Sequence, residues 1–329
     1  MTETLTRATQ PAPGVTRRVL RQRRRQLWRD RMIPVLLLLL GAVVLVYPVG
    51  ATFYNNYKQT EFARDYATKV AATDPMDLRA ELARARRYNA GLRPELLRDP
   101  WNEAKATTDA NYQEYLTQLD LLDTMARIRI PSLKVDLPVL HGTSDDALAK
   151  GVGHFFGTAL PVGGPGTHAV LTGHSSLSNA TLFDHLDRLT EGDEFYIEVL
   201  GDTIAYRVDK ITIVLPDQLD GLASTPGADH LTLVTCTPHA VNSHRLLVRA
   251  TRIPYSPVHE AGPTGTIAGV DLTIQSWMWP RLLGAAAAII AVIAMIIGWV
   301  LRDRKRARDR ERKATLAAAA RHTDESTPT

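Results

Sequence analysis

Cysteine is almost absent from this chain of 329 residues, which contains only Cys236. A single thiol cannot close an internal disulfide, so no cystine framework stabilises the fold. Aromatic residues are also few, at 6% of the chain, but hydrophobic residues make up 45%. That share can supply both a core and membrane spans. The lone thiol is therefore a reactive group, a partner in an intermolecular bond, or a buried side chain retained by chance.

Charge is unevenly distributed along the sequence. Residues 1–32 contain nine Lys and Arg against two acidic residues, and residues 281–329 contain ten against five. The segment 55–280 is net acidic, with 20 basic and 28 acidic residues. The pI near 9.2 would suit nucleic-acid binding, but the basic residues are confined to two tails beside apolar runs. A membrane boundary explains this pattern better, and we expect no nucleic-acid partner.

Two apolar runs, residues 32–54 and 282–301, are long enough to cross a bilayer. About 20 helical residues span the ~30 Å hydrocarbon core. A basic cluster precedes the first run and another follows the second. The positive-inside rule therefore places both termini in the cytoplasm and the intervening chain outside the cell. The alternative for the first run is a signal peptide cleaved near Val49-Gly50-Ala51.

The exported segment is predicted to begin with helices and continue with strands. Asp74-Pro75 marks a break between two helices, Gly91 closes the second, and prolines make residues 93–111 a predicted loop. Apolar alternation begins at residue 127. Further strands are predicted at 167–174, 194–200, 202–215, 230–236 and 243–253.

The strand pattern favours a mainly β barrel or sandwich. At least six or seven short strands are predicted, with only one or two short helices among them. Within residues 202–215 the apolar parity switches at Asp209-Lys210, which predicts a bulge or sharp bend.

Several motifs that resemble known sites fail in their details. The glycine-rich PVGGPGTH lacks the Lys and Ser/Thr of a phosphate loop. GHSSLS lacks the nucleophile-elbow pattern, so neither Ser175 nor Ser176 is expected to be a nucleophile. Nine of the ten histidines lie in the exported segment, but none has zinc-ligand spacing. We expect no cofactor and no metal.

Cys236 has two candidate partners. HAVLTGH ends at His174 as LTLVTC ends at Cys236, so neighbouring strands could bring an imidazole base to the thiol. If TPHAVNS reverses the chain, Arg245 lies beside the thiol, where its guanidinium suits a developing oxyanion. A loop histidine and a surface arginine are the alternatives at this point.

Three segments carry a resemblance to a known family. TLVTC (232–236) resembles the T-L-x-T-C motif of sortases, the membrane-bound cysteine transpeptidases of Gram-positive bacteria. CTPHAVNSHRLLVRA and residues 160–199 resemble the segments around the nucleophile and the histidine of class C, pilus-assembling sortases. DPW (99–101) resembles their lid motif. His239-Ala240 replaces the Tyr-Gly common in class C, which leaves details of the substrate groove open.

The resemblance covers about residues 127–252 and implies a fold and a site. The implied fold is a sortase-type closed β-barrel of about eight strands, with an N-terminal helical hairpin and a lid loop, flanked by two transmembrane helices. The implied site comprises Cys236 as nucleophile, His174 as general acid and base, Arg245 as substrate and oxyanion stabiliser, and the lid residues Asp99, Pro100 and Trp101. In the lid, Asp99 is expected to pair with Arg245, and Trp101 to cover Cys236.

The implied reaction is transpeptidation without a cofactor. Cys236 cleaves an LPxTG-like sorting signal between Thr and Gly and transfers the resulting thioacyl group to a pilin lysine. The partners would be pilins or surface proteins with such signals. A housekeeping-type sortase that anchors proteins to peptidoglycan is one alternative. A non-enzymatic, membrane-anchored assembly scaffold with a structural cysteine is another.

The resemblance also divides the chain into eight segments. In order, we expect a cytoplasmic tail, a membrane helix, an extracellular helical hairpin, a lid region, a catalytic barrel, a linker, a second membrane helix and a second cytoplasmic tail. Their expected ranges are 1–32, 33–54, 55–92, 93–111, 112–255, 256–281, 282–301 and 302–329.

Overall fold

The computed structural model describes residues 17–92, 110–257 and 274–324. The chain forms two compact units. One is Pro48–Thr273, which holds the strands and the shorter helices. The other combines Met1–Tyr47 with Ile274–Thr329 and holds part of one long helix and the whole of another.

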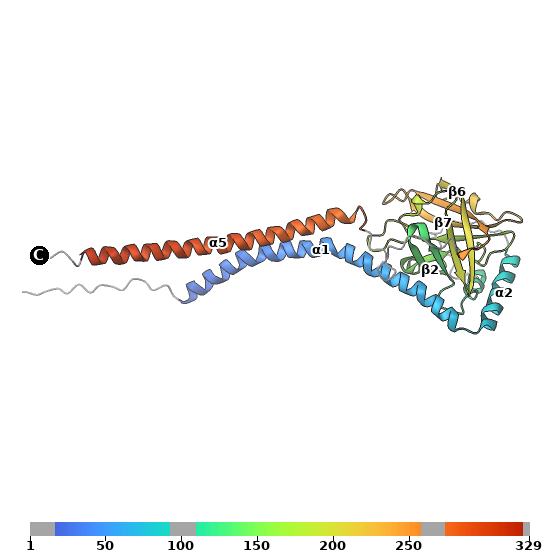
Figure 1. Cartoon of the computed structure of the whole chain (residues 1–329), viewed down its shortest axis with the longest axis horizontal. Coiled ribbons are helices and arrows are strands. Elements are labelled where there is room, and N and C mark those ends of the chain that lie inside the picture. The colour runs from blue at the N-terminus through green and yellow to red at the C-terminus, as the bar shows by residue number, and fades with distance from the viewer. Residues whose placement is uncertain (1–16, 93–109, 258–273, 325–329) are drawn as a thin grey trace, which may run out of the picture. The chain divides into compact units, whose positions relative to one another are not determined.

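Eight strands of the first unit form a closed, mixed barrel (Figure 1). The strands are β1 (Ala126–Ile130), β2 (Val135–His141), β3 (Val152–His154), β4 (Thr167–Thr172), β5 (Glu194–Val199), β6 (Asp202–Val214), β7 (Asp229–Thr237) and β8 (His244–Ile253). Their order around the barrel is β1-β2-β3-β4-β7-β8-β6-β5. Two neighbouring pairs are parallel, β2 with β3 and β4 with β7. The predicted closed barrel is confirmed.

Alternating side chains fill the barrel, as the pattern of β1 illustrates. Ala126, Ile128 and Ile130 are fully buried, whereas Arg127 and Arg129 between them are partly exposed. Complete burial of a large aliphatic side chain contributes about 1.5–3 kcal/mol. The alternation therefore fixes which face of the strand points inward, because a slip of one residue would bury the arginines.

The irregularity predicted near Asp209-Lys210 is present in the longest strand. The register of β6 against β8 shifts between Val208 and Lys210. An extra residue at such a point bends the strand and increases its twist. The bulge thus helps a strand of 13 residues to follow the curved wall of the barrel.

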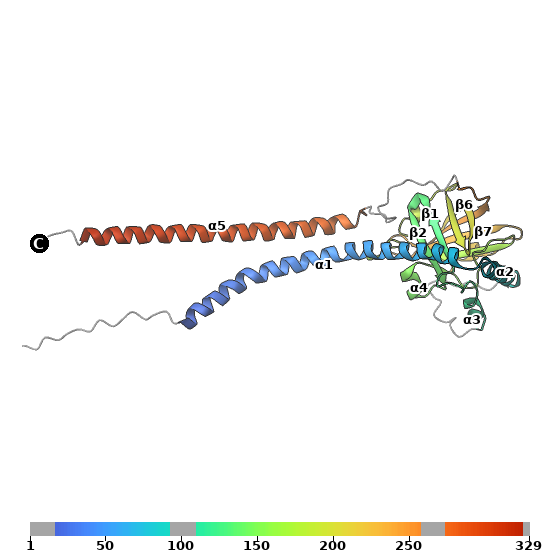
Figure 2. The same ribbon diagram turned by 60° about the horizontal axis from the view of Figure 1, so that its bottom comes forward.

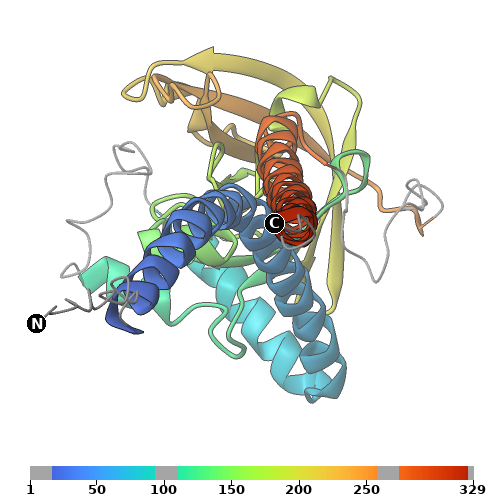
Figure 3. The same cartoon turned by 90° about the vertical axis from the view of Figure 1, so that its left-hand side faces the viewer.

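Four described helices lie wholly or partly in this unit: α1 (Arg17–Ala72), α2 (Pro75–Gly91), α3 (Ala110–Leu116) and α4 (Asp145–Lys150). The break between α1 and α2 has a local cause. The Asp74 carboxylate accepts the Met76 N–H at 2.7 Å, and Pro75 occupies the first turn of α2. Figure 3 shows α2 turning back from the C-terminal end of α1.

Buried tyrosines attach the helices to the barrel. The Tyr66 hydroxyl of α1 donates to the Met125 carbonyl at 3.3 Å and accepts the Leu200 N–H at 2.7 Å. The Tyr115 hydroxyl of α3 donates to the His154 carbonyl at 3.1 Å. Figure 2 shows α2 and α3 together beside the strands. These bonds fix the helices to the barrel that carries the candidate site.

Two described helical segments are long and apolar enough to cross a membrane, Trp28–Ala72 and Met278–Leu316. The second unit contains the first of them up to Tyr47 and the whole of the other. The first lies in α1, and the second lies in α5 (Met278–Asp324). Within this unit, the guanidinium of Arg31 donates two hydrogen bonds to the Asp303 carboxylate, at 2.8 and 2.9 Å. Two apolar helices of this length are compatible with a membrane-anchored protein.

Candidate active site

The parallel pairing of β4 with β7 brings two predicted site residues to the same barrel edge. The Gly173 N–H donates to the Val234 carbonyl at 3.0 Å, and the Thr235 hydroxyl donates to the Gly173 carbonyl at 2.7 Å. His174 is the next residue after Gly173, and Cys236 the next after Thr235. Both residues therefore lie at the carboxyl end of their strands, on adjacent positions of the edge.

Arg245 reaches the same edge from β8. Cys236 and Arg245 are directly opposite each other in the antiparallel β7–β8 ladder. Arg245 is only 7% exposed, and its Nη1 donates to the carbonyls of Asn242 and His244 at 3.1 and 3.2 Å. The strand pairings thus place all three residues that the sequence singled out at the same barrel edge, with Cys236 on β7 between β4, which leads to His174, and β8, which carries Arg245.

The surroundings of His174 favour its neutral form. Burial lowers the pKa of the half-buried imidazole, and the carboxylate of Asp145, in the first turn of α4, opposes this effect. A neutral imidazole at pH 7 can accept a proton from a thiol or an amine. Cys236 is half-buried and, as the single cysteine of the sequence, takes no part in an internal disulfide. The three side chains therefore suit acyl transfer through a thiolate nucleophile, with a base and a cationic donor.

Two loops meet at this edge. The histidine loop, residues 173–185, follows β4, and the cysteine loop, residues 238–243, follows β7.

The hydroxyl groups of Ser175 and Ser176 form hydrogen bonds with the backbone around Cys236. The Ser175 hydroxyl donates to the Cys236 carbonyl at 2.7 Å, and the Ser176 hydroxyl accepts the Ala240 N–H at 2.7 Å. These hydrogen bonds between the two loops could not be predicted from the sequence motifs.

The predicted lid residues Asp99, Pro100 and Trp101 lie outside the described residues. Their expected contacts with Arg245 and Cys236 stay predictions. Within the described ranges, no group of three or more His, Cys, Asp or Glu side chains could hold a metal ion.

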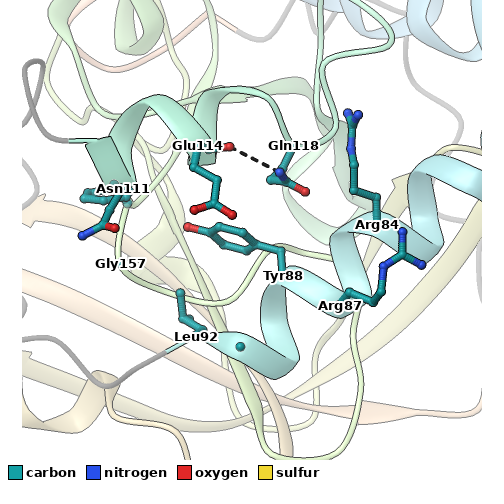
Figure 4. A pocket seen from close by; sticks show the side chains of 10 residues that line it. Arg84, Arg87, Tyr88, Leu92, Asn111, Glu114, Gln118 and Gly157 are labelled. Carbon is teal, nitrogen blue, oxygen red and sulfur yellow. Dashed lines mark hydrogen bonds between the residues drawn. The ribbon is translucent and has the colours of Figure 1, made fainter.

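A separate pocket of about 590 Å³ lies between α2 and α3 (Figure 4). Its lining consists of Arg84, Arg87, Tyr88, Gly91, Leu92, Asn111, Glu114, Gln118, Phe156 and Gly157. In Figure 4 the two arginines come from α2, and Glu114 comes from α3. None of the three candidate catalytic residues lines this pocket, so it is not part of the candidate active site.

Comparison with known proteins identifies the family. A family model described as the sortase domain matches residues 128–253. The crystal structure of sortase C-1 from Actinomyces oris is 50% identical, with a TM-score of 0.54, over 55% of this chain and 99% of that one. A Streptococcus pneumoniae sortase C, described in connection with pilin substrate specificity, is 38% identical, with a TM-score of 0.55, over 59% of this chain and 97% of that one.

A curated sequence relative agrees. Sortase A of Bacillus anthracis is 26% identical over 217 residues, which cover 66% of this chain and 91% of that protein. The chain therefore belongs to the sortase family of cysteine transpeptidases. Its structural neighbours include class C pilin sortases.

Proposed function

We propose that this protein is a pilus-assembling sortase that joins pilin subunits through a thioacyl intermediate on Cys236. The observation that carries the proposal is the meeting of His174, Cys236 and Arg245 at one barrel edge, through the β4–β7 and β7–β8 pairings. The similarity to class C sortases supports the pilin as the substrate class. The proposal takes the nucleophile, the base and the cationic donor from these three residues.

The proposed reaction has two acyl-transfer steps. The Sγ of Cys236 attacks the Thr carbonyl carbon of an LPxTG-like signal, and the Thr–Gly C–N bond breaks. His174 takes the proton of the Cys236 thiol as Sγ attacks and donates that proton to the departing Gly amine, which leaves a thioester on Cys236. A pilin lysine amine then attacks the thioester carbon, His174 takes up the amine proton, and the thiolate departs.

Arg245 has a positional role in both steps. Its guanidinium is the cationic donor opposite Cys236 in the ladder, where a tetrahedral intermediate would carry negative charge on oxygen. A planar fork of N–H donors can hold such an oxygen and a substrate carbonyl together. The two carbonyl contacts of Nη1 restrict the orientation of the side chain.

The expected anchoring completes the proposal. Both termini lie in the cytoplasm, the two apolar helices cross the cell membrane, and the barrel faces the exterior, where exported pilins arrive. The segment limits predicted above, including the lid region at 93–111, form part of this proposal. Asp99, Pro100 and Trp101 close over the site until a sorting signal enters.

Mass spectrometry tests the proposed function directly. The full-length chain in detergent, mixed with an LPxTG peptide, should gain the mass of the acyl fragment, and Cys236→Ala should not. Addition of a pilin with an accessible lysine should move that fragment to the lysine. If only a peptidoglycan-type amine accepts it, the protein is a housekeeping-type sortase. If no adduct forms on folded protein, the scaffold alternative stands.

A further inference from the structure

A buried carboxylate lies in the histidine loop, beyond the three residues that carry the proposed reaction. The side chain of Asp184 is 3% exposed, and its Oδ1 accepts the Ser176 N–H at 2.5 Å. Burial raises the pKa of Asp184 to about 6, although the Ser176 N–H and His239 oppose this effect. Burying an ionised carboxylate is unfavourable. The loop therefore retains a group that lowers its stability at neutral pH.

The contact with Asp184 fixes an unusual backbone conformation close to His174. Ser176 has a φ of 67°, in the left-handed region that residues with a Cβ avoid. A charge-assisted hydrogen bond from its N–H favours that conformation. In addition, the Phe183 N–H donates to the His174 carbonyl at 3.0 Å. The two ends of the histidine loop are thus tied together at His174 and at Ser176.

The same loop is hydrogen-bonded to the backbone of Cys236 and of Ala240 in the cysteine loop. Ser175 donates to the carbonyl of Cys236, and the N–H of Ala240 donates to the hydroxyl of Ser176, both at 2.7 Å. The His239 Nε2 lies 3.9 Å from Oδ1 of Asp184, although the histidine side chain is 54% exposed. The first two bonds are the stronger links, since an exposed ion pair contributes little.

We propose that Ser175, Ser176 and Asp184 form a positioning clamp that keeps His174 at reacting distance from Cys236. The clamp rests on the roles given to His174 and Cys236 under the proposed function. Its three members act through the backbone of the two loops, by the hydrogen bonds with the Cys236 carbonyl, the Ser176 N–H and the Ala240 N–H. A displacement of about 1 Å in such a site can lower the rate about 10²-fold.

Steady-state kinetics on the full-length chain in detergent tests the clamp. Asp184→Ala removes the acceptor of the Ser176 N–H, so we expect kcat to fall about 10- to 100-fold while KM for the sorting peptide changes less than about twofold. Asp184→Asn keeps an acceptor oxygen of the same shape and should restore most of kcat. Ser178→Ala, an exposed serine of the same loop, is the matched control and should behave as the wild type. A wild-type kcat in Asp184→Ala would overturn the proposal.

Hydrogen exchange separates failure of the clamp from failure of the proposed function. In Asp184→Ala, the amides of Ser176 and Ala240 should exchange with deuterium at least about tenfold faster, while amides of the β7–β8 ladder stay protected. Unchanged exchange at these two amides would overturn the clamp, whatever the activity. If exchange accelerates but the wild type forms no acyl adduct, the proposed function fails and the structural link between the loops is retained. Should Asp184→Ala not fold, the same comparison is made with Ser176→Ala, which removes only the hydroxyl bridge to Ala240.

Discussion

At the scale of single residues, two backbone carbonyls, those of Asn242 and His244, accept hydrogen bonds from Nη1 of Arg245. Both bonds restrict the direction in which the guanidinium points. That arrangement suits a group that must stabilise negative charge appearing only during the reaction. It also means that the shape of the side chain, and not only its charge, is expected to matter.

Arg245→Lys should therefore lower turnover about 10²- to 10³-fold, the range found for loss of an oxyanion donor. A lysine keeps the positive charge but cannot offer a planar fork of donors. The measurement is kcat for transfer of a sorting peptide to an amine. Arg249→Lys, on the same strand but paired with Asp209, is the control and should retain near-normal turnover. Near-normal turnover in Arg245→Lys would mean that charge alone suffices.

Asp145 is expected to influence the pKa of His174, the proposed base. Its carboxylate raises the pKa of His174 against the larger, opposing effect of burial. Asp145→Asn should therefore lower the pKa of His174 further and move the acidic limb of the kcat/KM profile to lower pH. Asp146→Asn is the control, since Asp146 pairs with Lys150 on the same helix. A shift of the limb to higher pH would contradict the assignment of His174 as the base.

Asp184 should make stability depend on pH. Because its pKa rises from 3.8 to about 6 on folding, the wild type should lose stability as the pH increases through that interval. Asp184→Asn lacks this dependence. At pH 7.5 the variant should be more stable, by at most about 3 kcal/mol, since one pKa unit corresponds to about 1.4 kcal/mol. Thermal unfolding of wild type and variant at pH 5 and 7.5 measures the difference in stability. A variant less stable than the wild type at pH 7.5 would contradict the prediction.

At the scale of elements, helix α1 supports the histidine loop from outside the barrel. Asn56 donates to the Thr181 hydroxyl at 2.7 Å and accepts the Thr181 N–H at 3.0 Å. Asn55 donates to the Asn179 carbonyl at 2.9 Å. One helix that is long and apolar enough to span a membrane therefore also contacts the loop that carries His174.

Asn56→Ala should loosen this loop, because it removes both bonds to Thr181 at a cost of about 1–3 kcal/mol. We expect faster deuterium exchange at the Thr181 amide and a reduced kcat. Asn55→Ala, which removes a single exposed bond, is the matched control and should have a smaller effect. Equal exchange at Thr181 in wild type and Asn56→Ala would show that the helix does not hold the loop.

The lengths and pairings of the helices and strands explain which parts of the fold could be predicted from the sequence. Alternation and turn residues located the longer strands and the β6 bulge, because both are local patterns. β3 has three residues, and α3 and α4 have seven and six, which is too short for a periodicity to appear. The parallel pairing of β4 with β7 joins segments far apart in the sequence, which no local pattern encodes.

The same difference between local patterns and long-range contacts explains which site residues could be predicted from the sequence. Arg245 was placed beside Cys236 because a short turn between two strands implies a hairpin. The placement of His174 had to be inferred from strand ends and the family resemblance. Asp184 was not predicted, because its partner is the backbone N–H of Ser176, whose left-handed conformation is not encoded in a motif.

At the scale of the whole molecule, the proposed topology is open to a direct test. Protease added to intact protoplasts should digest the segment between the spans and spare the 302–329 tail, because a lipid bilayer shields it. Permeabilised protoplasts, in which both regions are digested, provide the control. Digestion of that tail from outside would show that the C-terminus lies outside the cell and would contradict the proposed orientation. A mature N-terminus near Val49 would instead support a cleaved signal peptide.

The parallel β4–β7 pair has a consequence for how an exported chain becomes active. Ser175 and Cys236, which bond across the two strands, are 61 residues apart, and β8 with Arg245 comes later still. Contacts between such distant segments form slowly, since a long loop must close first. On the proposed topology, the segment after the first span is exported in sequence order, so His174 reaches the exterior before Cys236 and Arg245. Under the proposed function, Cys236 would then acquire both partners only when nearly the whole barrel has been exported, and a partly exported molecule would not yet form the thioacyl intermediate.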